Sequence, residues 1–203
     1  KRMIFYIIAI ILGYLMGGIP VGLLIGKIVK RVDIREHGSG KIGTTNVLRT
    51  IGRPAAVLVL TLDICKTIAA VIIIRMITGP LEAELLAAIS VMAGHNWPIF
   101  TGFKGGRGTA PGLGGLIIFS PWAAIAACIG GLPTILISKY VSLGSIIGTL
   151  AGGLTLFILG LVGVIPIQYG IYGIAGGITI IVSHKDNIAR IYSGTERKFG
   201  SSI

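Results

Sequence analysis

The chain has 203 residues, of which 53% are hydrophobic and only 12% are charged. Soluble domains carry about 25% charged residues, so this composition excludes an ordinary water-facing globular protein and indicates an integral membrane protein. The 18 Lys and Arg exceed the 7 Asp and Glu and give a net charge of +11. We expect no nucleic-acid partner, because the chain has no polar basic face interleaved with exposed aromatic residues.

Seven apolar segments predict an all-α fold with seven transmembrane helices. A helix needs about 20 apolar residues to cross the hydrocarbon core of a bilayer, and all but one segment come near that length. In chain order the segments are 3–26, 54–77, 81–99, 109–119, 121–138, 143–164 and 167–183. We expect residues 1–203 to form a single membrane-embedded domain.

Local signals set the ends of these segments. Segment 3–26 lacks a small-residue cleavage site and is longer than the apolar core of a signal peptide, which favours a retained helix. Pro54 takes a favoured first helical position, and Gly79-Pro80 ends that run. The short segment 109–119 follows a polar, glycine-rich stretch. Irregular backbone at membrane depth is tolerated only where it lines a cavity, so we expect a short inserted helix preceded by a glycine-rich loop.

The distribution of Lys and Arg predicts the orientation. The segments expected on the other side of the membrane contain only Lys1, Arg2 and Arg75. Cytoplasmic loops collect Lys and Arg, so the larger group predicts a cytoplasmic C-terminus and an N-terminus outside. The larger group has fourteen members: Lys27, Lys30, Arg31, Arg35, Lys41, Arg49, Arg53, Lys104, Arg107, Lys139, Lys185, Arg190, Arg197 and Lys198.

The first polar segment on the expected cytoplasmic side reads GSGKIGTTN over 38–46, with Arg49 after it. A Walker A loop is excluded because Ile42 follows Gly40-Lys41, and a dinucleotide loop is excluded because no apolar strand precedes the glycines. Backbone amides freed by glycines, hydroxyl groups, an amide and a guanidinium together suit a phosphate. A flexible loop that only caps the next helix is the alternative.

The second polar segment covers 94–98 and 103–109. Lys104 and Arg107 are separated by two glycines and open the short helix, which predicts a dense anion site. A basic loop attracted to anionic lipid headgroups is the alternative. The glycines favour a site, because headgroup attraction needs charge but no close approach of the backbone.

The third polar segment contains His184 and Asn187, which lie three residues apart and so on one side of a helix. A histidine at a helix end is more often a structural cap than a catalyst, but the neighbouring amide favours recognition of a hydroxylated ligand.

Asp63 and Lys66 lie halfway along a membrane segment. Charges at that depth are costly, and we expect these two to neutralise each other.

Several kinds of chemistry lack their residues in this sequence. We expect no cofactor and no metal, because no acidic pair has a spacing suited to Mg²⁺ and no His/Cys cluster suits zinc. There is no GxSxG serine motif. The His-x₄-Asp dyad of acyl-CoA-dependent glycerol acyltransferases is also missing, since Ile42, Phe100 and Ala189 stand five residues after the three histidines. The sequence therefore offers many groups that bind anions and few general bases. Such a site suits a substrate whose electrophilic group is already activated when it binds.

The segments GSGKIGTTNVLR, GHNWPIFTGFKGGRG and HKDNIAR with SGTE resemble the three cytoplasmic motifs of the bacterial acyl-phosphate:glycerol-3-phosphate acyltransferases of the PlsY type. The resemblance covers nearly the whole chain. It implies seven membrane helices in the bacterial inner membrane, an active site on the cytoplasmic face and a monomer in contact with membrane lipids. It also implies transfer of an acyl group from acyl phosphate to the 1-hydroxyl of glycerol 3-phosphate, the first acylation step of phospholipid synthesis.

The resemblance also implies roles for individual residues. His184, Lys104 and Asn187 are expected to be catalytic, with His184 and Asn187 orienting the glycerol. Asp63, Lys66 and Glu196 are expected to support the structure. The residues expected to bind the phosphate and glycerol are Gly38, Ser39, Gly40, Gly43, Asn46, Arg49, Lys104, Gly105, Gly106, Arg107, Gly108, His184 and Asn187.

Two questions stay open at the level of sequence. The proton of the attacking hydroxyl passes either to a substrate phosphate or to His184, and the residues do not choose between them. A transporter or channel for an organic phosphate would use the same cations and glycines. A carrier usually shows an internal repeat or two matched broken helices, and this sequence shows one short segment without a second copy.

Overall fold

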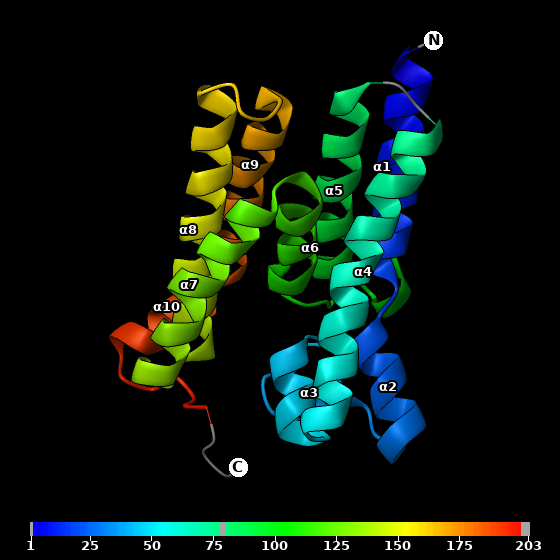
Figure 1. The fold of residues 1–203 in the computed structure, drawn as a ribbon. Helices are drawn as coiled ribbons and strands as arrows, with labels where there is room; N and C mark the ends of the chain where they lie inside the picture. The colour runs from blue at the N-terminus through cyan, green and yellow to red at the C-terminus, as the bar shows by residue number, and fades with distance from the viewer. Residues whose placement is uncertain (1, 78–79, 200–203) are drawn as a thin grey trace. The chain divides into compact units, whose positions relative to one another are not determined.

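The structure of the protein is a computed structural model that describes residues 2–77 and 80–199. The described residues are helical and contain no strand, as expected for an all-α membrane protein (Figure 1). The chain divides into two compact units, Lys1–Gly114 and Gly115–Ser202, which we call the first and second unit. The boundary falls inside one short helix.

The first unit contains three helices of 16 to 25 residues and a group of shorter elements that carry the polar segments. α1 packs closely on α5, because a methyl group at Gly13 or Gly17 would collide with the α5 backbone at Ala87 or Val91. Small residues allow such close approach of membrane helices. The elements are α1 (Arg2–Gly18), α2 (Val21–Lys30), η1 (Ile34–Glu36), α3 (Thr44–Thr50), α4 (Arg53–Ile77), α5 (Leu81–Asn96), η2 (Ile99–Thr101) and the start of α6 (Thr109–Phe119).

The prediction of one uninterrupted helix over 3–26 is wrong. α1 ends at Gly18 and α2 begins at Val21 (Figure 1). Pro20 has no N–H to continue the helical ladder, and its ring clashes with the carbonyl four residues earlier. The carbonyl of Met16 accepts from the Ile19 N–H instead, at 3.3 Å. Both halves are apolar, so hydropathy alone does not reveal the break.

The second unit contains the end of α6, then α7 (Pro121–Ser138), α8 (Val141–Leu161), α9 (Ile167–Ser183) and α10 (Lys185–Tyr192). α8 packs against both α7 and α9. Gly153 on α8 and Gly173 on α9 face each other, and a methyl group on either would collide with the backbone of the other. Glycine therefore sets the helix spacing in this unit as well.

The bounds of α6, α7 and α9 agree with the predicted segments 109–119, 121–138 and 167–183. Four helical stretches of the described chain are long and apolar enough to cross a membrane: Arg2–Lys30, which α1 and α2 share, Arg53–Ile77, Pro121–Ser138 and Val141–Leu161. The helices α6 and α9 are apolar but shorter. The expected break at Gly79 lies outside the described residues.

Candidate functional site

The first polar segment is organised around the side chain of Asn46, which is 1% exposed. Its Nδ2 lies within hydrogen-bond distance of three backbone carbonyls, those of Ile34 (2.8 Å), Lys41 (2.9 Å) and His37 (3.1 Å). Its Oδ1 accepts from the Ser39 N–H at 2.9 Å. Both polar atoms of this amide, expected to contact a ligand, are thus engaged within the loop. The contacts suit a side chain that shapes the loop around Ser39.

The glycines of this loop differ in what they allow. Gly38 and Gly40 have φ of +58° and +68°, a backbone conformation that strains other residues. A methyl group at Gly38 would also collide with Oδ1 of Asn46. Gly43 has an ordinary φ of −80°, and a methyl group there would meet no atom within 4 Å. The loop therefore needs Gly38 and Gly40 for its own shape, whereas Gly43 leaves open space beside the backbone.

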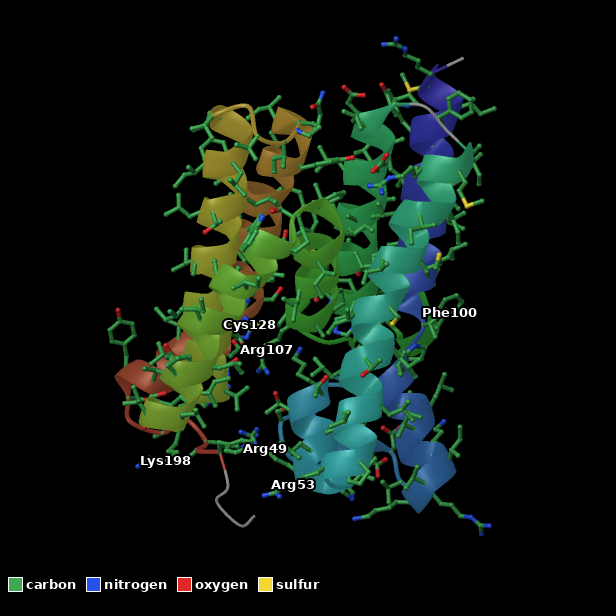
Figure 2. All side chains as sticks on the ribbon, viewed as in Figure 1. Arg49, Arg53, Phe100, Arg107, Cys128 and Lys198 are labelled. Atoms are coloured by element: carbon green, nitrogen blue, oxygen red, sulfur yellow. The ribbon has the colours of Figure 1, made fainter. Side chains whose placement is uncertain are left out.

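Arg49 and Lys104 are two of the three cations in the first unit that were expected to bind phosphate, the third being Arg107. Arg49 lies in the last turn of α3 and is partly exposed (Figure 2). Lys104 lies in the loop before α6, and its side chain is exposed and makes no hydrogen bond or ion pair with a described residue. The ammonium of Lys104 is thus available to an anion.

The glycines after Lys104 lie directly on His95, the penultimate residue of α5. The Gly106 N–H donates to the His95 carbonyl at 2.9 Å. A methyl group at Gly106 would collide with the His95 imidazole, and one at Gly105 would meet the carbonyls of His95 and Asn96. Gly108, with φ of +79°, turns the chain into α6. Gly105 and Gly106 lie so close to the end of α5 that only glycine fits at these two positions.

Asp63 and Lys66 form the expected ion pair, with Lys66 Nζ 2.8 Å from Asp63 Oδ1, and both side chains are buried. Lys66 Nζ also donates to the Gly17 carbonyl at 2.9 Å and lies 2.8 Å from His95 Nδ1. The sequence assigns His95 no role beyond its place in the second polar segment. No local signal could have found it, because its partners come from α1, α4 and the loop before α6.

His184 is 3% exposed and lies at the junction of α9 and α10. Its Nδ1 is 2.8 Å from the Ile180 carbonyl. A carbonyl only accepts hydrogen bonds, so Nδ1 carries the proton, and the neutral ring then has a lone pair on Nε2. The backbone of α9 therefore prepares His184 Nε2 to accept a hydrogen bond or a proton.

Glu196 connects the tail to α10 and α8. It accepts hydrogen bonds from Asn187 Nδ2 (2.7 Å), Ser142 Oγ (2.8 Å) and Arg190 Nε (2.8 Å). Burial alone would raise the pKa of Glu196, but these three donors hold the pKa below its ordinary value. Asn187 is 4% exposed, and its Oδ1 has no hydrogen-bond partner among the described residues. Glu196 thus fixes the amide so that its oxygen is left for another group.

The predicted site residues fall into two groups, one in each unit. The first unit holds Ser39, Asn46 and Arg49 in one segment and the Lys104–Gly108 stretch, which includes Arg107, in another. The second unit holds His184, Asn187 and Glu196. Within residues 2–77 and 80–199, no three His, Cys, Asp or Glu side chains gather in a way that could hold a metal ion.

Comparison with known proteins gives matches along nearly the entire chain. A profile of the family described as glycerol-3-phosphate acyltransferase matches residues 7–194. A glycerol-3-phosphate acyltransferase 3 of Dehalococcoides mccartyi is 39% identical over 207 residues, which cover 95% of this chain and 94% of the relative. The glycerol-3-phosphate acyltransferase of Alkaliphilus metalliredigens is 40% identical over 194 residues, with 96% of each chain covered.

Two solved structures are also similar. Both are crystal structures of PlsY (YgiH), described as an integral membrane glycerol 3-phosphate acyltransferase, one in its glycerol 3-phosphate form and one in its lysophosphatidic acid form. Each is 36% identical to this chain, and the TM-scores are 0.88 and 0.86. The first alignment covers 96% of both chains, and the second covers 96% of this chain and 95% of the other.

Proposed function

Because the chain belongs to the glycerol-3-phosphate acyltransferase family, we propose that it acylates the 1-hydroxyl of sn-glycerol 3-phosphate with acyl phosphate as the donor. The products are lysophosphatidic acid and inorganic phosphate, in the first acylation step of phospholipid synthesis. The observation that carries the proposal is the match of 96% of the chain to a protein whose structure is described as its glycerol 3-phosphate form. The motif residues of this chain supply the chemistry that such a substrate requires.

The choice of donor follows from what the site has to supply. Acyl phosphate is a mixed anhydride with a good leaving group, so attack by a hydroxyl needs little help from a general base. The main task is to hold two phosphate-bearing molecules together despite their repulsion, which calls for cations and amide donors. Lys104, Arg49 and Arg107 supply positive charge, and the glycine-rich loops supply backbone N–H groups.

The reaction is a direct attack without an acyl-enzyme. The glycerol hydroxyl oxygen forms a bond to the acyl carbonyl carbon, and the bond from that carbon to the phosphate oxygen breaks. The phosphate leaves with the electron pair and takes up the hydroxyl proton. His184 Nε2 and Asn187 Oδ1 orient the glycerol by accepting hydrogen bonds from it and do not take the proton of the attacking hydroxyl, while Ser39 and Lys104 bind the substrate phosphate.

The chain crosses the bacterial inner membrane seven times in this proposal, with its N-terminus outside and its site on the cytoplasmic face. It acts as a monomer and as a single membrane-embedded domain, with lipids around it. The excess of Lys and Arg in the polar segments supports this orientation. The test is labelling of single cysteines in intact cells after Cys65 and Cys128 are replaced by alanine. Lys41→Cys and Lys185→Cys should be labelled only by permeant reagents, and Val164→Cys by impermeant ones.

One assay separates the enzyme from a carrier. Purified protein in detergent should release inorganic phosphate from palmitoyl phosphate when glycerol 3-phosphate is present, and labelled lysophosphatidic acid should form in equal amount. Palmitoyl-CoA in place of palmitoyl phosphate should give no product. A transporter or channel for organic phosphate would give neither product, and efficient use of palmitoyl-CoA would overturn the choice of donor.

A further inference from the structure

A buried charged cluster in the first unit takes no direct part in the proposed reaction. It consists of Asp63 and Lys66 on α4 and His95 on α5, with the Gly17 carbonyl at the end of α1. The side chains of Asp63 and Lys66 are almost fully buried, and His95 is 4% exposed. Charges at this depth are costly to maintain, so a purpose beyond mutual neutralisation is expected of them.

The three contacts of Lys66 fix the state of the histidine ring. A charged ammonium has three N–H donors and no acceptor, and the three neighbours of Nζ are Gly17 O, Asp63 Oδ1 and His95 Nδ1, at 2.9, 2.8 and 2.8 Å. His95 Nδ1 must therefore accept. Asp63 Oδ1 is 3.5 Å from the same nitrogen, too long for a good hydrogen bond. The neutral ring then carries its proton on Nε2 and is locked in one orientation.

The locked ring forms the surface on which the Lys104–Gly108 stretch rests. The Gly106 N–H binds the His95 carbonyl at 2.9 Å, and the Gly106 Cα lies so close to the ring that no side chain fits between them. Lys104 is only two residues from this contact. The position of the loop backbone therefore depends on where the His95 ring lies.

We infer that His95 is a positioning residue for the proposed reaction. It sets the loop that carries Lys104 and Gly105 to Gly108, and the Asp63–Lys66 ion pair holds the ring in place. His95 touches neither substrate. The inference rests on the proposed function in assigning this loop to the substrate phosphate. A displacement of about 1 Å in such a site can cost about 10²-fold in rate, so a residue beneath the loop can be as influential as one that touches the ligand.

The test is a double-mutant cycle between His95 and Gly106. Gly106→Ala places a methyl group against the ring and should raise the KM for glycerol 3-phosphate about tenfold or more. In a His95→Ala background the ring is gone, and the same methyl group should raise the KM little further, because the two changes act on one contact. Equal effects of Gly106→Ala in both backgrounds would overturn the inference.

Two more variants separate positioning from general loss of the fold. Gly177→Ala on α9 is the matched control, since its methyl group would meet only Thr149 Cγ2, at 3.9 Å, and it should leave KM and thermal unfolding in detergent unchanged. His95→Asn keeps an acceptor for Lys66 but removes the ring. It should unfold at nearly the wild-type temperature and still raise the KM for glycerol 3-phosphate, and a wild-type KM would contradict the inference.

The experiment also separates this inference from the proposed function. If the wild-type protein transfers no acyl group from palmitoyl phosphate, the proposed function fails. Calorimetric titration of the same variants then measures the dissociation constant of glycerol 3-phosphate, which does not depend on acyl transfer. Unchanged dissociation constants for His95→Asn and Gly106→Ala would show that His95 does not position the loop. If the wild type is active and both variants keep its KM, the inference fails while the function stands.

Discussion

His95 in the first unit and His184 in the second unit are held in opposite tautomers. In the first unit, His95 Nδ1 accepts from Lys66, so the neutral ring has its proton on Nε2. In the second unit, His184 donates from Nδ1 to the Ile180 carbonyl, so the lone pair of the neutral ring lies on Nε2. Only such a nitrogen accepts from a hydroxyl group. The same residue type therefore positions a loop in one unit and faces the proposed chemistry in the other.

The site residues of the two units also differ in charge and in exposure. The first unit presents charge from loops, and Lys104 is exposed there without a partner among the described residues. The second unit presents neutral acceptors from buried side chains on and beside α10, fixed by Glu196 and by the backbone of α9. Loops with cations suit the binding of a phosphate, whereas rigid neutral groups suit the orientation of one hydroxyl.

Removal of the free ammonium is the strongest test of the first unit. Lys104→Ala should abolish detectable turnover of palmitoyl phosphate, because the proposed phosphate site then loses its exposed cation. Lys41→Ala removes the same charge from the same unit and should keep most of the activity. Phosphate release by both purified variants is the measurement. Near-normal activity of Lys104→Ala would take Lys104 out of the phosphate site.

Two substitutions at His184 test the second unit. We expect His184→Gln to retain most of kcat, because its amide oxygen can accept the hydrogen bond that orients the glycerol, while a substrate phosphate takes the proton of the attacking hydroxyl. His184→Ala should raise the KM for glycerol 3-phosphate about tenfold or less, as expected for one lost neutral hydrogen bond. If His184 is instead the general base, both variants should lose about 10²–10⁴-fold in kcat, and measuring kcat and KM separately decides between the two.

The sequence predicted most of the helix ends, because they depend on local signals. Ser120-Pro121 and Pro166 mark the starts of α7 and α9, and both helices begin where expected. The break between α1 and α2 was missed although Pro20 is present, because a long apolar run suggested one membrane span. Hydropathy measures the affinity for lipid and carries no information on backbone hydrogen bonds.

The sequence was less informative about what each polar side chain touches. It predicted the Asp63–Lys66 pair, whose members lie one helical turn apart. It did not predict the contact of Lys66 with His95, which joins two helices. It assigned Asn46 to the ligand, whereas the structure engages both polar atoms of this amide within the loop. A side-chain amide can form hydrogen bonds with the backbone or with a ligand. Only the folded structure shows which of the two it contacts.

The asparagines of the two units provide the next test. Asn46→Ala would leave the Lys41 carbonyl and the Ser39 N–H without this partner, at about 1–3 kcal/mol for each group, and would remove one of two donors from the Ile34 and His37 carbonyls. We therefore expect a clear fall in the thermal unfolding temperature in detergent together with weaker binding of glycerol 3-phosphate. Asn187→Ala leaves Glu196 bound to Ser142 and Arg190 and should lower activity with a smaller loss of stability. The reverse order of unfolding temperatures would contradict the contrast.

The smallest expected effect is the pH dependence of the second unit. Because the hydrogen bonds of Glu196 hold its pKa below the ordinary carboxyl value, its stabilising contribution is complete above that value and is lost as the pH falls through the lowered pKa. Glu196→Gln should therefore unfold at a lower temperature than the wild type at neutral pH, and the difference should shrink on acidification below the ordinary value. Glu36→Gln, at an exposed position on η1, should keep the wild-type curve. A constant difference between wild type and Glu196→Gln at all pH values would show that the charge of Glu196 does not hold the tail on α10.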